Sequence, residues 1–287
     1  LRMPRSAGVS AKPVMNAEIL RRALEYSKMF GLPVISHCED INLSRNGVMN
    51  EGFVSTKLGL KGIPRASEIT MVMRDIELMQ LSGARLHIAH VSAKESVEAI
   101  REAKKRGVKV TCETCPHYFT LTEDAALGFN TSAKVNPPLR TKEDVEAIKK
   151  GLADGAIDVI ATDHAPHTTA DKQKEISLAA SGISGFETAL GSVMQLVTAG
   201  QLTLAEMLFR LTTSPARILG ARCGRLGSLT VGAAADICIL DPDAEWTVDP
   251  ACFASKGRNT PLGGRTLKGR VTATIAGGRM ASREITK

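Results

Sequence analysis

The chain has 287 residues, enough for one large α/β domain with a small appendage, and its 43% hydrophobic and 23% charged residues are typical of globular proteins. No apolar run reaches the roughly 18 residues of a membrane span, and residues 1–10 lack the apolar segment of a signal peptide, so we expect a cytoplasmic protein that does not bind membranes. The formal net charge of +7 comes with only 3% aromatic residues, which argues against nucleic acid as a partner and suits an anionic small-molecule substrate.

Helices and strands are predicted to alternate over the first two-thirds of the chain. Gly31 is expected to end the first helix, Ser92 with Glu95 to cap the third, and Thr141 to cap the fourth. Strands separated by such helices are typical of βαβ units, so we predict an α/β fold with parallel strands side by side. The predicted helices cover 17–30, 69–81, 93–106 and 142–152, with a further pair in 185–219, and the predicted strands cover 32–37, 85–90, 108–112 and 158–162.

The character of the sequence changes at about Cys223. Glycine-rich turns there separate short alternating strands over 235–240 and 270–276. We therefore predict two domains, residues 1–222 with the parallel sheet and residues 223–287 as a small β domain.

The six cysteines show no disulfide framework. Cys112 and Cys115 form a lone CxxC motif, whereas a structural zinc site would need a second pair of ligands. A redox motif should open a helix, but this one is expected at the end of a strand. We therefore expect buried, reduced thiols at both positions.

Histidines and an aspartate stand at the ends of predicted strands. His37 and His90 each end an apolar strand, and Asp-His-Ala-Pro-His follows the last strand at 163–167. Each histidine alone is more often a core residue than a ligand, and His87 points to the opposite face of its strand from His90. Because the carboxyl ends of parallel strands share one edge, two imidazoles and Asp163 together fit a hydrolytic zinc site. Such an ion lowers the pKa of its water, and the carboxylate can pass the proton to the departing nitrogen.

Residues 162–167, Thr-Asp-His-Ala-Pro-His, resemble the signature of the dihydroorotases of the bacterial zinc type in the amidohydrolase superfamily. The resemblance covers nearly everything after Lys12 and implies an amidohydrolase TIM barrel with a small C-terminal β-sandwich domain. It also implies a function, the reversible cyclisation of N-carbamoyl-L-aspartate to L-dihydroorotate in pyrimidine biosynthesis, with Zn²⁺ as cofactor. Further blocks resemble the same family in the same order, at residues 35–40, 87–92, 115–122, 134–140, 185–188 and 226–277.

The resemblance implies a set of metal ligands. His37 and His90 match the metal-binding histidines, and Asp163 matches the metal-bound carboxylate that acts as acid and base. The family's His-x-His pair is absent, and Ser10 stands where the family has a bridging carboxylate. With three ligands left, we expect at most one zinc ion.

The resemblance also implies how substrate is held. Asn136 and His167 match substrate-binding residues, and the backbone of Ser181 and Gly182 matches a loop that meets the pyrimidine ring. Ser181 stands where the family has an aromatic residue, which weakens that contact. The long polar loop 168–182 beside these residues is expected to be a mobile lid.

The first four strands of the family's barrel have no counterpart in this sequence. We therefore expect only the later barrel strands, in a chain that belongs to a longer protein or pairs with something that completes it. One alternative, which the missing ligands favour, is an inactive dihydroorotase-like subunit that scaffolds aspartate transcarbamoylase. Another is a cyclic-amide hydrolase for hydantoins or allantoin, against which residues 163–167 argue. A homo-oligomer acting on a small molecule is the expected assembly.

Overall fold

A parallel β-sheet forms the centre of the first two-thirds of the molecule. The computed structural model describes residues 12–220, 224 and 226–283. Each strand pairs in parallel with the next, so the predicted parallel arrangement is confirmed and the carboxyl ends of the strands share one edge of the sheet. The strands lie in the order β1 (Pro33–Ser36), β4 (Arg85–Ile88), β5 (Thr111–Thr114) and β6 (Val159–Ile160).

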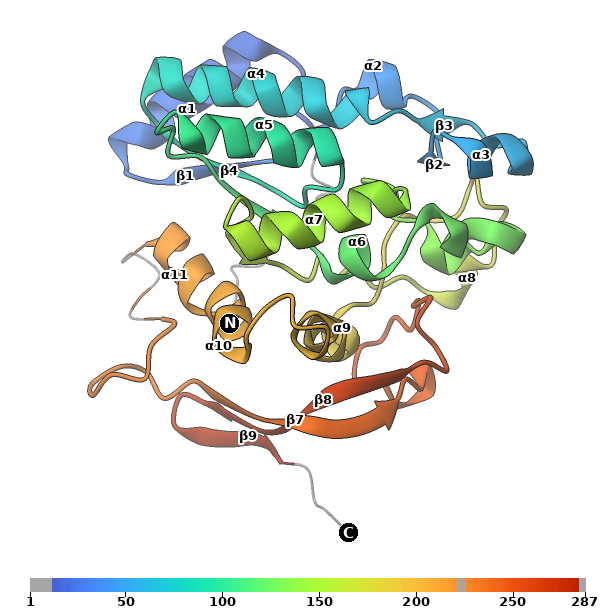
Figure 1. Ribbon diagram of the computed structural model, residues 1–287, viewed down its shortest axis with the longest axis vertical. Coiled ribbons are helices and arrows are strands. Elements are labelled where there is room, and N and C mark those ends of the chain that lie inside the picture. Colours follow the sequence, from blue (N-terminus) through green and yellow to red (C-terminus); the bar gives the residue numbers. More distant parts are fainter. Residues whose placement is uncertain (1–11, 221–223, 225, 284–287) are drawn as a thin grey trace.

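A layer of neighbouring helices covers this sheet close to the predicted positions. Its members are α1 (Ala17–Met29), α4 (Ala66–Ser82), α5 (Lys94–Lys105) and α7 (Lys142–Asp154). Figure 1 shows α4 and α5 on one side of β1 and β4. Among the described residues, no helix of this layer or elsewhere combines the length and the apolar character needed to cross a membrane.

The helix ends show where local sequence decides and where packing does. The Asn16 side chain accepts hydrogen bonds from the first amides of α1, and Thr141 caps α7 as predicted. The prediction that Ser92 caps α5 is wrong. The residue at the N-cap is Ala93, and the hydroxyl group of Ser92 donates to the carboxylate of Glu68 in α4. Glu68 also accepts from the backbone amides of Ser92 and Ala93. A buried carboxylate of the neighbouring helix thus takes the place of the local cap.

The strand predicted over 108–112 begins later in the structure. Val108 lies just past α5 and closes the end of that helix, because its amide donates to the carbonyl of Ala103. Pairing with β4 starts only at Thr111, which lies opposite His87. This shift places Cys115 directly after β5, at the carboxyl edge of the sheet.

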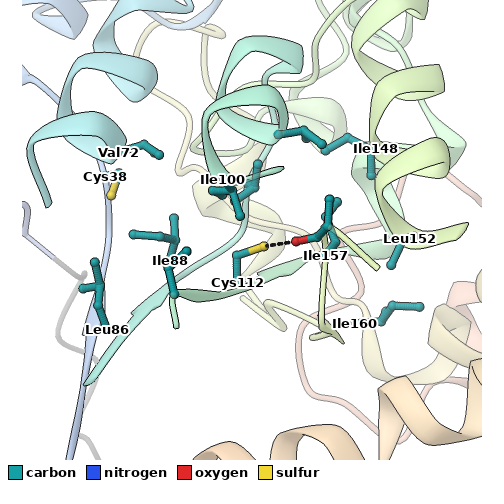
Figure 2. Close-up of a cluster of buried hydrophobic side chains, with 14 of the residues drawn as sticks. Cys38, Val72, Leu86, Ile88, Ile100, Cys112, Ile148, Leu152, Ile157 and Ile160 are labelled. Atoms are coloured by element: carbon teal, nitrogen blue, oxygen red, sulfur yellow. Dashed lines mark hydrogen bonds between the residues drawn. The ribbon is translucent and has the colours of Figure 1, made fainter. Parts of the chain in front are cut away.

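The main hydrophobic core lies between the parallel sheet and its helices. Figure 2 shows Ile88 of β4 and Ile100 of α5 in this core, and both are fully buried. Burying such a side chain stabilises a fold by about 1.5–3 kcal/mol. The thiol of Cys112 lies in the same core and donates to the carbonyl of Ala156 at 3.3 Å. Cys112 and Cys115 are both buried free thiols, as predicted.

Short elements that the sequence did not predict surround the strand ends. Arg140 links the short strands β2 (Met49–Asn50) and β3 (Gly62–Ile63). Its guanidinium donates to the side chain of Asn50 in β2 at 2.9 Å and to the carbonyl of Ile63 in β3 at 2.8 Å. Such charge-assisted hydrogen bonds fix short elements that are not stable alone. These elements are α2 (Ile41–Ser44), β2 (Met49–Asn50), α3 (Phe53–Leu58), β3 (Gly62–Ile63), α6 (Pro116–Thr120), η1 (Glu123–Phe129), η2 (Thr131–Ala133) and α8 (Thr169–Lys172).

The last third of the chain forms further helices and an antiparallel sheet. Thr212 leaves the helical conformation, so the pair of helices predicted over 185–219 is divided further. The sheet contains both predicted strands and lies beneath α9 and α10 in Figure 1. Packing against α9 is close, since a Cβ at Gly191 would meet the Leu267 side chain at 2.8 Å. The elements are α9 (Phe186–Thr198), α10 (Leu204–Leu211), α11 (Thr213–Leu219), β7 (Ile237–Thr247), η4 (Pro250–Cys252), β8 (Thr266–Ala276) and β9 (Arg279–Arg283).

Candidate active site

His37 and His90 meet at the carboxyl edge of the parallel sheet. His37 directly follows β1, and His90 follows β4 by two residues. Nδ1 of His37 lies 2.7 Å from Nε2 of His90, and the rings pack edge to face. The 2.7 Å distance is that of a hydrogen bond between the rings, and two imidazole nitrogens that face one another in this way could bind one metal ion after a small separation of the rings.

Glu39 holds the other side of the His37 ring. Its carboxylate accepts hydrogen bonds from Nε2 of His37 at 2.8 Å and from the Asn136 amide at 3.0 Å. The hydrogen bond from His37 is the main cause that lowers the pKa of Glu39 from 4.5 to about 2. A carboxylate on one ring nitrogen fixes the tautomer and leaves the other nitrogen available to a metal. Sequence reasoning missed Glu39, although a carboxylate two residues after a strand-end histidine was an available signal.

His90 and Asp163 both adopt positive backbone φ angles, of 38° and 44°. Residues other than glycine rarely occupy this region, and those that do cluster at functional sites. Burial raises the pKa of Asp163, and the nearby His90 opposes that rise. Burial, followed by the charge of His37, lowers the pKa of His90. The Asp163 carboxyl therefore keeps a proton more readily than an exposed aspartate would, which suits an acid–base group.

The residues predicted to hold substrate fall into two groups. Asn136 lies in the hydrogen-bond network of Glu39. His167, Ser181 and Gly182 lie together elsewhere on the rim, where Nε2 of His167 donates to the Ser181 carbonyl at 2.9 Å. Gly182 has a φ of 146°, and a Cβ there would meet the Cβ of Ala165 at 2.6 Å, its backbone oxygen at 2.8 Å and Nε2 of His167 at 2.9 Å, so this position requires glycine.

Asn259, from the segment between β7 and β8, binds the two loops that carry His167 and Gly182. Its Nδ2 donates to the carbonyls of Ala165 at 3.2 Å and Gly182 at 2.9 Å. Its Oδ1 accepts from the His167 amide at 2.8 Å. Sequence reasoning missed Asn259 because it stands 92 residues after His167, in the segment assigned to the β domain.

Two other histidines near the site have partners of their own. His164 stacks on Phe186 with ring centroids 3.8 Å apart, and its Nδ1 accepts hydrogen bonds from backbone amides at the start of α9. The ring nitrogens of His87 lie 2.9 Å from the Thr111 hydroxyl and 3.2 Å from the Glu113 carboxylate. Neither ring therefore joins the facing pair at the sheet edge.

A further group of potential metal ligands includes Asp163. One ligand atom each from Cys115, His117 and Asp163 all lie within 4.8 Å of one another. Nε2 of His117 is buried without a hydrogen-bond partner in the described part of the chain, and burial lowers the pKa of His117 to about 3. Burial, followed by the charge of Asp163, raises the pKa of the Cys115 thiol. The sequence analysis placed Cys115 in a CxxC motif and in a block that resembles the family, but it assigned no ligand role to Cys115 or His117 and so missed this group.

The loop predicted to act as a lid is anchored at its base. The ammonium group of the buried Lys172 donates to the carbonyls of Thr131 at 2.9 Å, Lys134 at 3.3 Å and Ala180 at 2.8 Å. Burial, with a smaller contribution from Lys134, lowers the pKa of Lys172 to about 8. The hydrogen bonds of Lys172 do not involve the exposed residues 173–175. Closure of the loop over a ligand stays a prediction.

Two of the side chains at the sheet edge, His37 and His90, face one another as ligands of one divalent metal ion could, whereas in the described part of the chain the ligand atoms of Asp163 group with Cys115 and His117. The facing nitrogens of His37 and His90 supply two ligands, Glu39 orients one of them, and Asp163 offers a carboxylate at the same edge. Ser10, where a bridging carboxylate was expected, lies outside the described residues.

Comparison with known proteins identifies related sequences. Residues 6–281 match the Amidohydrolase family. The dihydroorotase of Pelotomaculum thermopropionicum is 59% identical over 273 residues, which are 95% of this chain and 63% of that protein. The dihydroorotase of Syntrophus aciditrophicus is 54% identical, with the same coverage of 95% and 63%. The chain thus spans 63% of the length of these curated relatives.

Solved structures with the same fold also resemble this one. The L-hydantoinase (dihydropyrimidinase) of Arthrobacter aurescens has a TM-score of 0.83 at 27% identity, over 93% of this chain and 61% of that chain. The dihydropyrimidinase of Brevibacillus agri has a TM-score of 0.83 at 23% identity, over 93% of this chain and 60% of that chain. Because the family match extends over residues 6–281, this chain belongs to the amidohydrolase family.

Proposed function

We propose that the chain catalyses the dihydroorotase reaction, the reversible cyclisation of N-carbamoyl-L-aspartate to L-dihydroorotate in pyrimidine biosynthesis. The observation that carries this proposal is the pair of nitrogens, His37 Nδ1 and His90 Nε2, 2.7 Å apart at the sheet edge where Asp163 also stands. The pair occurs in a chain that is 59% and 54% identical to two curated dihydroorotases. Ring closure joins the terminal ureido nitrogen to the side-chain carboxyl carbon and releases water, so the site has to polarise a carbonyl and move protons.

The proposed metal ligands are His37, His90 and Asp163, and the proposed ion is a single Zn²⁺. When bound, the ion would polarise the reacting carbonyl and lower the pKa of a water molecule. Glu39 supports this ligand set, because its hydrogen bond to Nε2 of His37 leaves Nδ1 facing His90.

The proposed proton carrier is Asp163. Burial raises the pKa of its carboxyl group, which suits a group that both accepts and donates a proton. In the hydrolytic direction Asp163 would accept a proton from water and give it to the ring nitrogen as the carbon–nitrogen bond breaks. In the synthetic direction it would take the proton from the attacking ureido nitrogen and give it to the hydroxyl group that leaves the carboxyl carbon as water.

The proposed substrate contacts lie on both sides of this group. Asn136, held by Glu39, and the ring of His167 offer polar side chains to the substrate. The backbone at Ser181 and Gly182 would meet the pyrimidine ring. The net charge of +7 suits a dianionic substrate such as carbamoyl aspartate.

We also propose that the parallel sheet is the later part of an amidohydrolase TIM barrel over residues 1–222. Residues 223–287 would then belong to a small β-sandwich domain. The edge strand β1 supports the barrel, because Ile35 at this edge is 57% exposed and a further barrel strand would cover it. As in the sequence prediction, the proposed assembly is a homo-oligomer. Docking on aspartate transcarbamoylase is the alternative role if the chain binds metal but has no turnover.

A hydantoinase is the second candidate function. It is favoured by the TM-score of 0.83 and 27% identity to the L-hydantoinase of Arthrobacter aurescens. The two activities differ in the ring that is opened, a six-membered dihydropyrimidine with a carboxylate in one case and a five-membered hydantoin in the other. Turnover of hydantoin faster than that of dihydroorotate would overturn the dihydroorotase assignment.

The test is the absorbance change on ring opening of dihydroorotate by the zinc-loaded chain and by Asp163→Asn. Because general acid–base groups contribute about 10²–10⁴-fold to rate, Asp163→Asn should lower kcat by at least about 100-fold. Asp171→Asn is the control, since Asp171 in α8 carries the same charge and contacts Thr168 and Lys174 rather than a proposed ligand. Equal turnover in wild type and Asp163→Asn would remove the proposed mechanism.

A further inference from the structure

Cys115, His117 and Asp163 form a compact cluster beside the proposed catalytic pair. The ends of the neighbouring strands β5 and β6 deliver these side chains, and one ligand atom of each lies within 4.8 Å of the other two. A tetrahedral ion with ordinary zinc–sulfur and zinc–nitrogen bonds would hold such atoms roughly 3.6 Å apart. Small side-chain rotations are therefore enough to close the cluster around an ion.

The cluster is buried, and one of its polar atoms lacks a partner. Cys115 is fully buried and His117 is only 5% exposed. Among the described residues, nothing hydrogen-bonds to Nε2 of His117. An unpaired buried polar atom in a native protein points to a bound water or ion. The adjacent thiol and carboxylate favour an ion, because both are further donors of electron pairs to a metal.

We propose that this cluster binds a thiophilic divalent cation, Zn²⁺ in excess or Cd²⁺, at a position separate from the His37–His90 pair. On binding, the Cys115 thiol releases its proton to solvent, and the sulfur forms a bond to the ion. The thiolate and the Asp163 carboxylate together balance the double positive charge, while His117 adds a neutral imidazole. This ligand set selects zinc and softer ions over Mg²⁺ and Ca²⁺, which prefer oxygen ligands.

The cluster and the proposed catalytic site share Asp163. An ion at Cys115 and His117 binds an Asp163 oxygen there and neutralises part of its charge, which weakens Asp163 as a ligand and proton carrier beside His37 and His90. Occupancy of the cluster therefore inhibits turnover, a consequence that rests on the proposed function. The binding of the ion itself does not depend on that function.

The test is a Cd²⁺ titration of the metal-free chain, followed through the ultraviolet band that a thiolate gains when it binds cadmium. Cys115→Ala removes the thiol of the cluster, and Cys112→Ala removes an equally buried thiol of the core as the matched control. Wild type, Cys112→Ala and His37→Gln should show the band, and Cys115→Ala should lack one thiolate's share of it. His117→Gln and Asp163→Asn retain the thiol and should shift the titration to higher cadmium concentrations, which guards against a folding defect in Cys115→Ala.

Each outcome decides for or against the cluster. The exposed Cys238 and Cys252 contribute equally to the band of every variant. The signal is therefore the difference in band size between wild type and each variant. A band of equal size in wild type and Cys115→Ala overturns the proposal, as does an unshifted titration in both His117→Gln and Asp163→Asn. Dihydroorotate turnover is measured separately, on the zinc-loaded chain from the same preparation. A chain without turnover contradicts the proposed function, while the cadmium titration still decides whether the cluster binds the ion.

Discussion

Glu39→Gln perturbs the proposed metal site without touching a proposed ligand. The Glu39 carboxylate accepts from Nε2 of His37 at 2.8 Å and from the Asn136 amide at 3.0 Å. Glutamine keeps the shape and one acceptor oxygen but loses the charge, so the hydrogen bond from His37 weakens. The His37 ring is then held less firmly with Nδ1 toward His90, and we expect weaker zinc binding.

The lowered pKa of Glu39 gives the size of this effect. Its fall from 4.5 to about 2 is caused mainly by the hydrogen bond from His37. At about 1.36 kcal/mol for each pKa unit, the surrounding groups favour the charged carboxylate by at most about 3 kcal/mol. Only the part of this preference that acts through His37 bears on the metal site, and solvent screening reduces it further, so the expected loss of metal affinity lies near the lower end of the usual range, about tenfold. Removing the partner of a metal-bound histidine typically costs about 10–100-fold, which is consistent with this value.

Competition with a chromophoric chelator measures the zinc affinity of wild type and Glu39→Gln. Glu113→Gln is the matched control, because Glu113 also lies at hydrogen-bond distance, 3.2 Å, from Nε2 of a histidine, His87, which is not a proposed ligand. We expect Glu39→Gln to bind zinc about tenfold more weakly than wild type and Glu113→Gln to lose less. Equal affinities for wild type and Glu39→Gln would refute the reasoning that Glu39 orients His37.

Three further changes test the loops, the core and a buried lysine. Gly182→Ala should cost about 1–3 kcal/mol in chemical denaturation, because its Cβ would meet the Cβ of Ala165 at 2.6 Å and the backbone oxygen of Ala165 at 2.8 Å. Gly155→Ala, also at positive φ but in open space, should cost less, and equal losses would contradict the crowding. Ile100→Ala removes a fully buried side chain and should cost about 2–5 kcal/mol in urea unfolding, whereas a loss below about 1 kcal/mol would contradict close packing there. The pKa of Lys172 is lowered from 10.5 to about 8 in the folded chain, so the unfolded chain binds more protons between these pH values. The contribution of Lys172 to stability therefore rises with pH across that window, and Tm measured against pH should rise less in Lys172→Met; identical slopes would contradict the lowered pKa.

Local patterns determined those parts of the fold whose interactions are short in range. The alternation of apolar helices and strands predicted the parallel sheet, because each element must bury one apolar face. The Thr141 cap of α7 was predicted correctly because its partner Asp144 is three residues away. The positions of His37, His90 and Asp163 near strand ends followed from the same periodicity.

Packing decided the features whose partners are far apart in the sequence. Glu68 of α4 replaces the local cap that Ser92 was expected to provide for α5, because folding brings its buried carboxylate to three donors at once. Asn259 binds the backbone of His167 across 92 residues, which no local pattern records. Asn259 belongs to the segment after the predicted boundary at Cys223, yet its side chain holds the backbone of residues before that boundary.

The candidate site also combines features that the sequence predicted with features that only packing produced. The sequence placed His37, His90 and Asp163 near strand ends, but only the tertiary structure brought Nδ1 of His37 to 2.7 Å from Nε2 of His90. Only the tertiary structure, too, gathered Cys115 with His117 and Asp163. The physical reason is that hydrophobic periodicity records which face of an element is buried. The distance and orientation between two side chains depend on how separate elements pack, and on the hydrogen bonds that buried polar groups must then find.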